Sequence, residues 1–99
     1  MTMNYIYKIT NLINNKIYIG SSSTHRGLQT RWEEHLKAAR NSSNPSYNYP
    51  LQKGIRKYGI ENFKYEIIQE HIASLEERFE TEQNYIIANN SLTSGQGYN

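Results

Sequence analysis

Apolar and polar residues alternate over residues 4–10 (NYIYKIT) and again over residues 16–20 (KIYIG). This two-residue period is typical of a half-buried β-strand. The five residues between the two segments include three asparagines, a residue type that favours turns. The pattern therefore predicts a β-hairpin. Gly20 and the serines at 21–23 interrupt the alternation and are expected to end the second strand.

A helical period follows the predicted hairpin. Over residues 28–40, Leu28, Trp32, Leu36 and Ala39 recur every three or four positions. Such a spacing places these side chains on one side of a helix, where they would face a core.

Two further elements are predicted in the middle of the chain. Residues 49–58 are expected to form a helix, because Pro50 suits its first turn and Gly59 suits the left-handed residue after its end. Residues 63–70 alternate between apolar and charged side chains and predict a third strand. We expect the last nine residues to form a loop.

The last predicted helix begins at a capping box, with Ser74 as the cap and a glutamate three residues later. Leu75, Phe79 and Ile86 then recur at helical spacing. The position that completes this apolar stripe is occupied by Glu82. A carboxylate is therefore predicted on a face that points toward the core.

The order of predicted elements is strand, strand, helix, helix, strand, helix. We assign it to the α+β class, as a small sheet with helices packed on it, in a single domain of residues 1–99. The chain has no cysteine, which excludes a disulfide framework, a thiol nucleophile and a cysteine-ligated metal site. It has neither a long apolar run nor the pattern of a signal peptide. We therefore expect no membrane partner, and we expect a cytoplasmic location.

Charge is distributed unevenly along the chain. The net charge is +2, but residues 1–60 carry +7 and residues 61–99 carry −5. On charge alone, the acidic part can be the solvated face of a helix and nothing more. Alternatively, the basic part can be a surface for an anionic partner such as nucleic acid.

Glu82 is the sharpest chemical signal in the sequence. A carboxylate on a core-facing stripe is expected to be protonated, paired with a cation or bound to a metal ion. One explanation is an ion pair with Arg31 or another basic residue, or a stripe edge that reaches solvent. The other is a single carboxylate ligand to a largely hydrated magnesium ion, whose remaining ligands come from a phosphate substrate.

Arg31 and His35 lie four residues apart and therefore side by side on the first predicted helix. A guanidinium binds phosphate oxygens and an imidazole can move a proton, so the pair suits a phosphoryl centre, although a surface arginine beside an ordinary histidine would show the same spacing. Tyr7 and Tyr18 come from the two strands of the hairpin. A phenol is a poor base unless a nearby cation lowers its pKa.

Five motifs occur in the order of a known nuclease family. They are Tyr5-Ile6-Tyr7 paired with Tyr18-Ile19-Gly20, Arg31-Trp32-x-x-His35, Lys57-Tyr58-Gly59, Glu82 at the start of Glu-Gln-Asn-Tyr-Ile, and Gly97-Tyr98-Asn99. With these motifs the chain resembles the GIY-YIG nucleases, and most closely the catalytic domains of phage-type homing endonucleases. The first glycine of the family motif is replaced by Tyr5, a backbone position from which we expect little effect on activity.

The resemblance implies a three-stranded antiparallel sheet flanked by helices and an endonuclease that hydrolyses phosphodiester bonds in DNA with one divalent metal ion, magnesium or alternatively manganese. By the same resemblance, Glu82 holds the metal and Arg31 stabilises the charge on the phosphate. Tyr7 or Tyr18 acts as general base or orients the attacking water, and Tyr7 is favoured. His35 assists the tyrosine or the leaving group.

Further roles follow from the same resemblance and from the basic part of the chain. Asn99 is expected to buttress the site, and Lys53, Arg56 and Lys57 are assigned to the flanking DNA backbone. The chain is expected to act as a monomer or as a transient dimer on DNA, in the cytoplasm of a bacterial or phage-infected cell. Two alternatives stay open: a nucleic-acid-binding module without catalysis, and the catalytic fragment of a larger homing or repair nuclease.

Overall fold

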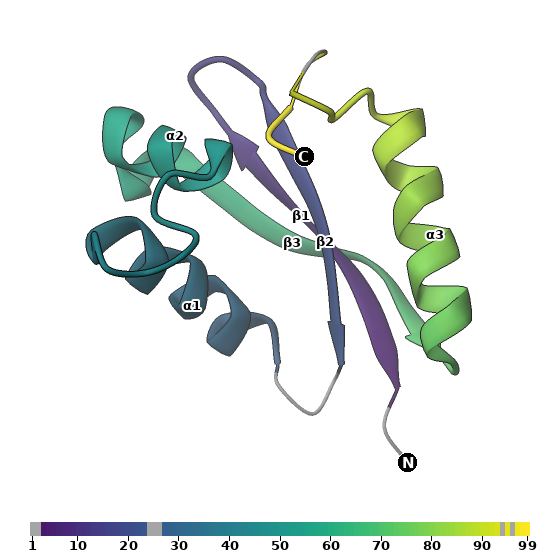
Figure 1. Ribbon diagram of the computed structural model, residues 1–99. Coiled ribbons are helices and arrows are strands. Elements are labelled where there is room, and N and C mark those ends of the chain that lie inside the picture. Colours follow the sequence, from purple (N-terminus) through teal and green to yellow (C-terminus); the bar gives the residue numbers. More distant parts are fainter. Residues whose placement is uncertain (1–2, 24–26, 94, 96) are drawn as a thin grey trace.

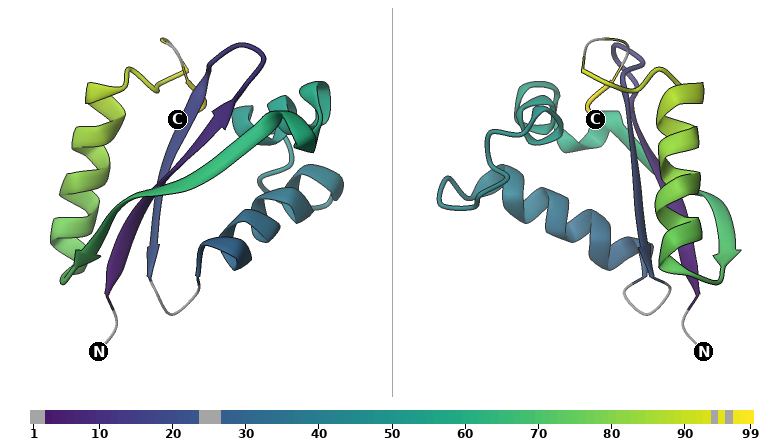
Figure 2. Two further views of the ribbon diagram at one scale, coloured as in Figure 1. Left: turned by 180° about the vertical axis from the view of Figure 1, so that it is seen from behind. Right: turned by 45° about the vertical axis from the view of Figure 1, so that its right-hand side comes forward.

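The computed structural model describes residues 3–23, 27–93, 95 and 97–99. Its elements follow the predicted order, with one short 3₁₀ turn before the last strand. They are β1 (Asn4–Asn11), β2 (Ile17–Ser23), α1 (Leu28–Arg40), α2 (Pro50–Tyr58), the 3₁₀ turn Ile60–Asn62, β3 (Phe63–Ile72) and α3 (Leu75–Ala88). The strands form one antiparallel sheet in the order β2-β1-β3. Helices α1 and α2 cover one face of this sheet and α3 covers the other (Figures 1 and 2). The predicted α+β architecture is confirmed.

The alternation along β1 distributes its side chains between two cores. Tyr5, Tyr7 and Ile9 point to the α1 and α2 side, where they pack with Trp32 and Leu51. Ile6 points to the other side and packs with isoleucines of β2, β3 and α3. Because β1 is the central strand, it is buried on both faces, and its aromatic residues sit at the centre of the larger core.

Strand β2 is longer than predicted. It continues through the serines at 21–23, which pair with Ile6, Tyr5 and Asn4 of β1. The glycine and the small polar side chains interrupt the apolar alternation but not the hydrogen bonding between the strands, which every backbone can make. The prediction that the second strand ends at Gly20 is therefore wrong, and the extra residues of β2 reach toward α3.

The described residues of the last nine form neither a helix nor a named strand, as predicted, but this segment is attached to β2. Gly97 forms a parallel bridge with Ile17, and the Tyr98 backbone N–H donates to the Ile17 carbonyl at 2.8 Å. Strand β2 lies at the edge of the sheet and therefore has backbone groups available for this pairing. The pairing brings Asn99 beside the middle of β2.

Helix α3 begins as predicted, because the Ser74 hydroxyl accepts the Glu77 backbone N–H at 3.1 Å. Its apolar stripe is less buried than expected. Ile86 is buried, whereas Leu75 is 58% and Phe79 is 53% exposed. The predicted core-facing stripe is therefore wrong over the first two turns, and Glu82 is half-buried rather than enclosed. Within the described part of the chain, no helix combines the length and the apolar character needed to cross a membrane.

Candidate active site

Four of the predicted site residues meet on the α1 side of the hairpin. The Tyr7 hydroxyl of β1 lies 2.9 Å from His35 Nε2 of α1. The Tyr18 ring of β2 contacts both partners, with its centroid 5.4 Å from that of His35 and 6.3 Å from that of Tyr7. Arg31 lies one turn before His35 on the same helix. The structure therefore brings together two phenols, an imidazole and a guanidinium from three elements.

Gly20 makes room for the Tyr7 phenol. Tyr7 and Gly20 are directly paired across β1 and β2, and Tyr7 has no exposed surface. A Cβ atom at position 20 would overlap the Cζ and Oη atoms of Tyr7. The requirement for glycine at this point of the motif is therefore steric: only a residue without a side chain lets the phenol reach His35.

Burial sets the protonation of these groups. It raises the pKa of Tyr7, and the neighbouring Tyr18 raises it further, while the charge of Arg31 acts in the opposite direction. Burial also raises the pKa of Tyr18, with Arg31 lowering it and Glu82 raising it. Burial and the Arg31 charge lower the pKa of His35 to about 4. Near pH 7 both phenols are thus protonated and the imidazole is neutral.

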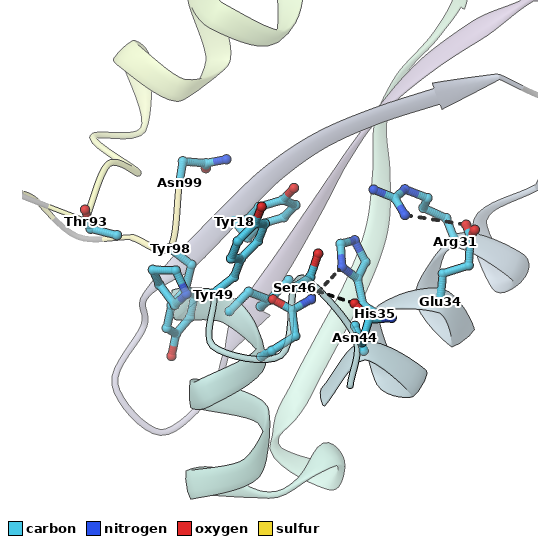
Figure 3. Close-up of a pocket in the computed structure, with 14 residues that line it drawn as sticks. Tyr18, Arg31, Glu34, His35, Asn44, Ser46, Tyr49, Thr93, Tyr98 and Asn99 are labelled. Carbon is cyan, nitrogen blue, oxygen red and sulfur yellow. Dashed lines mark hydrogen bonds and ion pairs between the residues drawn. The ribbon is translucent and has the colours of Figure 1, made fainter. Parts of the chain in front are cut away.

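A cavity of about 600 Å³ opens beside these residues, between β2, α1, the start of α2 and the end of the chain. Figure 3 shows His35 and Arg31 on one side of Tyr18, and Tyr98 and Asn99 on the other. Arg31 pairs with Glu34 at 3.4 Å and is 30% exposed, so its guanidinium can be reached from solvent. The cavity therefore presents a cation, a phenol and an imidazole together.

Glu82 approaches from the opposite face of the sheet. It lies on α3 and accepts a hydrogen bond from the Ser21 hydroxyl of β2. Because β2 is the edge strand, groups from both faces can reach the same rim, and Glu82 is close enough to Tyr18 to affect its pKa. A second cavity of about 440 Å³ lies along this rim and is lined by Ser21 and Arg31 among other residues. Arg31 pairs with Glu34 rather than with Glu82, whose carboxylate accepts from Ser21. The half-buried position of Glu82 agrees with the other explanation, a stripe edge that reaches solvent.

Ser21 is a site residue that the sequence analysis missed. The available signal was its position: two residues after Ile19, it continues the side of β2 that faces α3 once the strand is extended past Gly20. A serine at the end of an apolar alternation suggests a strand end, and only the pairing with β1 shows that the strand continues.

The residues around Glu82 fit a particular kind of metal site. Among the residues that the structure describes, no three histidine, cysteine, aspartate or glutamate side chains gather into a closed metal site. Glu82 offers one half-buried carboxylate at an open rim, with a serine hydroxyl beside it. Such an all-oxygen, incomplete set suits a hard cation that keeps most of its waters and takes further ligands from phosphate.

The side-chain amide of Asn99 bonds both the N–H and the carbonyl of one β2 residue, as the backbone of a paired strand does. Its side-chain carbonyl accepts the Ile19 N–H at 2.8 Å, and its amide donates to the Ile19 carbonyl at 2.8 Å. The Ser91 hydroxyl donates to the same Asn99 oxygen at 2.7 Å. Asn99 therefore holds the residue of β2 that lies between Tyr18 and Gly20.

The three basic residues of α2 are exposed, but they differ in their contacts. The Arg56 guanidinium donates to the carbonyls of Ala39 and Tyr47 at 3.1 and 2.7 Å, and it stacks on the Tyr47 ring at 3.7 Å. Lys57 lies over the ring of Tyr58. Arg56 thus joins α2 to the end of α1 and to the following loop.

Comparisons with known proteins identify the family to which this chain is similar. The family model described as "Putative endonuclease segE, GIY-YIG domain" matches residues 1–99. The relative "Putative endonuclease segB" of Enterobacteria phage T4 is 42% identical over 82 residues, which are 83% of this chain and 31% of that protein. The chain spans about a third of the length of the curated relatives that it matches.

Solved structures match the fold over almost its whole length. A mutant form of the catalytic domain of intron endonuclease I-TevI has a TM-score of 0.80 and 29% identity, over 98% of this chain and 92% of that one. The structure of the catalytic domain of homing endonuclease I-TevI has a TM-score of 0.78 and 30% identity, over 97% and 96% of the two chains.

Proposed function

The chain belongs to the GIY-YIG endonuclease family, and from this premise we propose that it hydrolyses phosphodiester bonds in DNA with one divalent metal ion, Mg²⁺ or alternatively Mn²⁺. The observation that carries the proposal is the convergence of Tyr7, Tyr18, Arg31 and His35 on one side of the β2 edge, with Glu82 on the other. A cation and a lone carboxylate on one open rim suit a phosphate group better than a small neutral ligand.

Arg31 is assigned to the phosphate. Its guanidinium lines both cavities and is partly exposed, so it can bind two phosphate oxygens and stabilise the negative charge that develops in the transition state. The ion pair with Glu34 fixes the direction of the guanidinium before substrate arrives. DNA binding would exchange part of this contact for phosphate oxygens.

Glu82 is the residue that would hold the metal, with Ser21 directing its carboxylate. When bound there, Mg²⁺ supplies positive charge to the leaving oxygen of the phosphodiester. With one carboxylate in the site, we propose one metal ion rather than two.

In this proposal a tyrosine acts as general base toward the attacking water or orients it, and Tyr7 is the favoured residue. Its oxygen is the one held by His35, whereas the charge of Arg31 favours the ionised form of Tyr7 and Tyr18 alike. Because Tyr7 has no exposed surface in the free protein, its neighbours have to rearrange before water reaches its oxygen. Tyr18 lines the cavity and is the first phenol that an entering water meets.

A plasmid-nicking assay tests the proposal. The chain is incubated with supercoiled plasmid and Mg²⁺ or Mn²⁺, and with EDTA as the control. We expect metal-dependent nicking rather than double-strand breaks, because one site cuts one strand and a second cut requires another copy of the chain. No cleavage with any divalent metal would contradict the proposal.

The alternative is a DNA-binding module without catalysis. The excess of positive charge in residues 1–60 is compatible with it. Salt-dependent binding of DNA with no cleavage would favour this alternative. Because two of the matched relatives belong to a phage of enterobacteria, we propose that the protein acts in the cytoplasm of a bacterial or phage-infected cell.

A further inference from the structure

Gln52 lies directly behind His35 in the site. It comes from the first turns of α2, is 3% exposed, and its side-chain Nε2 is 3.2 Å from His35 Nδ1. The other nitrogen of the same imidazole is 2.9 Å from the Tyr7 hydroxyl. A line of hydrogen bonds therefore runs from α2 through α1 to β1. No motif in the sequence singles out Gln52.

The chemistry of the amide gives this line a direction. The Nε2 atom of a glutamine can only donate, so His35 Nδ1 must be the acceptor and carry no proton. A neutral imidazole has one N–H, which is then on Nε2 and points at the Tyr7 oxygen. Burial keeps the ring neutral near pH 7, since the pKa of His35 is lowered to about 4.

We propose that Gln52 is a positioning residue that fixes His35 in the form protonated on Nε2, so that the imidazole donates a hydrogen bond to the Tyr7 oxygen. This inference rests on the proposed function and deepens it. His35 does not act as a base toward Tyr7 in this arrangement. It supplies a donor that stabilises negative charge on the phenol when the attacking water is activated.

The three side chains that form these hydrogen bonds are buried. Gln52, His35 and Tyr7 are each at most 5% exposed, so little solvent reaches the hydrogen bonds between them. The charged and titratable groups around the imidazole are Arg31 and Glu34 on its own helix and the phenols of Tyr7 and Tyr18. Among these neighbours, Gln52 is the group that contacts Nδ1, and it therefore decides which of the two ring nitrogens carries the proton.

The tautomer can be observed directly. Long-range ¹H–¹⁵N spectra of the ¹⁵N-labelled chain report which nitrogen of His35 is protonated at pH 7, with a His35→Gln sample for assignment. We expect a protonated Nε2 and a bare Nδ1. In Gln52→Glu, the carboxylate can only accept, so Nδ1 gains a proton. In Gln52→Leu, the two tautomers mix.

Cleavage kinetics then test the role. We expect Gln52→Leu to lower kcat about tenfold, the effect of losing one orienting hydrogen bond, with KM changed less than about twofold. Gln69→Leu is the matched control, because Gln69 accepts from the Tyr85 hydroxyl on the other face of the sheet. It should leave both constants unchanged. Melting curves of all variants show that the fold is retained.

Two results would overturn the inference. One is a parent His35 protonated on Nδ1. The other is an unchanged kcat in Gln52→Leu when its spectrum shows mixed tautomers. A parent with the expected tautomer that cuts no DNA would instead contradict the proposed function, while supporting the assignment of the hydrogen bonds.

Discussion

At the scale of single residues, the site depends on steric fit as much as on charge. Tyr7 reaches His35 only because Gly20 has no side chain, and Glu82 is directed by a serine hydroxyl. The residue types of the site were readable from the sequence, because the motifs contain them. The partners Ser21 and Gln52 were not, since their roles depend on contacts between elements distant in the chain.

Replacing Gly20 by alanine should damage the site through Tyr7. The new methyl group would overlap the end of the phenol, and such overpacking costs roughly 1–3 kcal/mol of folding stability. We expect a lower melting temperature and strongly reduced cleavage. Removing the Tyr7 hydroxyl in the same chain relieves part of the overlap, so Gly20→Ala and Tyr7→Phe should couple in a double-mutant cycle of unfolding free energies. Strict additivity would refute the steric explanation.

Ser21→Ala should weaken the response to metal. Without the hydroxyl, the Glu82 carboxylate loses its orienting bond, so a higher Mg²⁺ concentration is needed for half-maximal cleavage. The expected increase is roughly tenfold, with cleavage at saturating Mg²⁺ close to that of the parent. Metal titrations of Ser21→Ala and of Ser43→Ala, a remote loop serine, provide the comparison. An unchanged titration would mean that Ser21 does not direct Glu82.

The pH profile should follow Tyr7 and not His35. Burial raises the pKa of the Tyr7 phenol, so its basic form increases with pH throughout the neutral range and the cleavage rate should rise from pH 6 to 9. His35, with a pKa of about 4, is neutral over this whole range and adds no acid limb. Tyr7→Phe should be slow and nearly independent of pH. A profile with a break near 6.5 that His35→Gln removes would contradict these protonation states.

At the scale of elements, most of the fold could be predicted from the sequence, but the end of β2 and the pairing of the C-terminal segment with it could not. The alternation over residues 4–10 and the helical spacing over 28–40 identify β1 and α1, because each has a continuous apolar side to bury. The extension of β2 and the pairing of Gly97 with Ile17 were missed. Both rely on backbone hydrogen bonds, which leave no pattern in the side chains.

The stripe on α3 shows the opposite error. Leu75 and Phe79 have the spacing of core residues, yet both are more than half exposed. Side-chain spacing defines a face of a helix but not how much of that face the sheet covers. The same partial cover leaves Glu82 accessible at the rim, which is what a metal ligand requires.

The basic residues of α2 should differ in their roles: Arg56 stabilises the fold, whereas Lys53 and Lys57 bind the DNA backbone. Arg56 binds two carbonyls outside α2 and stacks on Tyr47, so Arg56→Gln should lower the unfolding free energy by about 1–2 kcal/mol. For Lys53→Gln and Lys57→Gln we expect weaker DNA binding with a shallower salt dependence and little change in stability. Denaturation curves and binding at several salt concentrations separate the two effects. Equal losses of affinity in all three variants would show that Arg56 also binds the DNA backbone.

At the scale of the whole molecule, the fold places the residues of the proposed site on opposite faces of one sheet, and the two groups meet at the edge strand β2. Tyr7, Arg31 and His35 belong to the α1 side, and Glu82 belongs to the α3 side. Seven acidic residues lie within residues 61–99, and among them the Glu82 carboxylate bonds Ser21 at the β2 edge. The sequence motifs identify these residues, but only the sheet order explains why they meet.

The role of Glu82 as the metal ligand is tested most directly by the Mg²⁺-dependent cleavage rate of Glu82→Gln compared with Glu80→Gln. Both changes remove one charge from the same helix, but Glu80 is exposed and the Glu82 carboxylate bonds Ser21 at the β2 edge. We predict that Glu82→Gln abolishes cleavage at every Mg²⁺ concentration while DNA binding persists, and that Glu80→Gln cuts as the parent does. Equal cleavage by the two variants would contradict the assignment of this edge as a one-metal nuclease site.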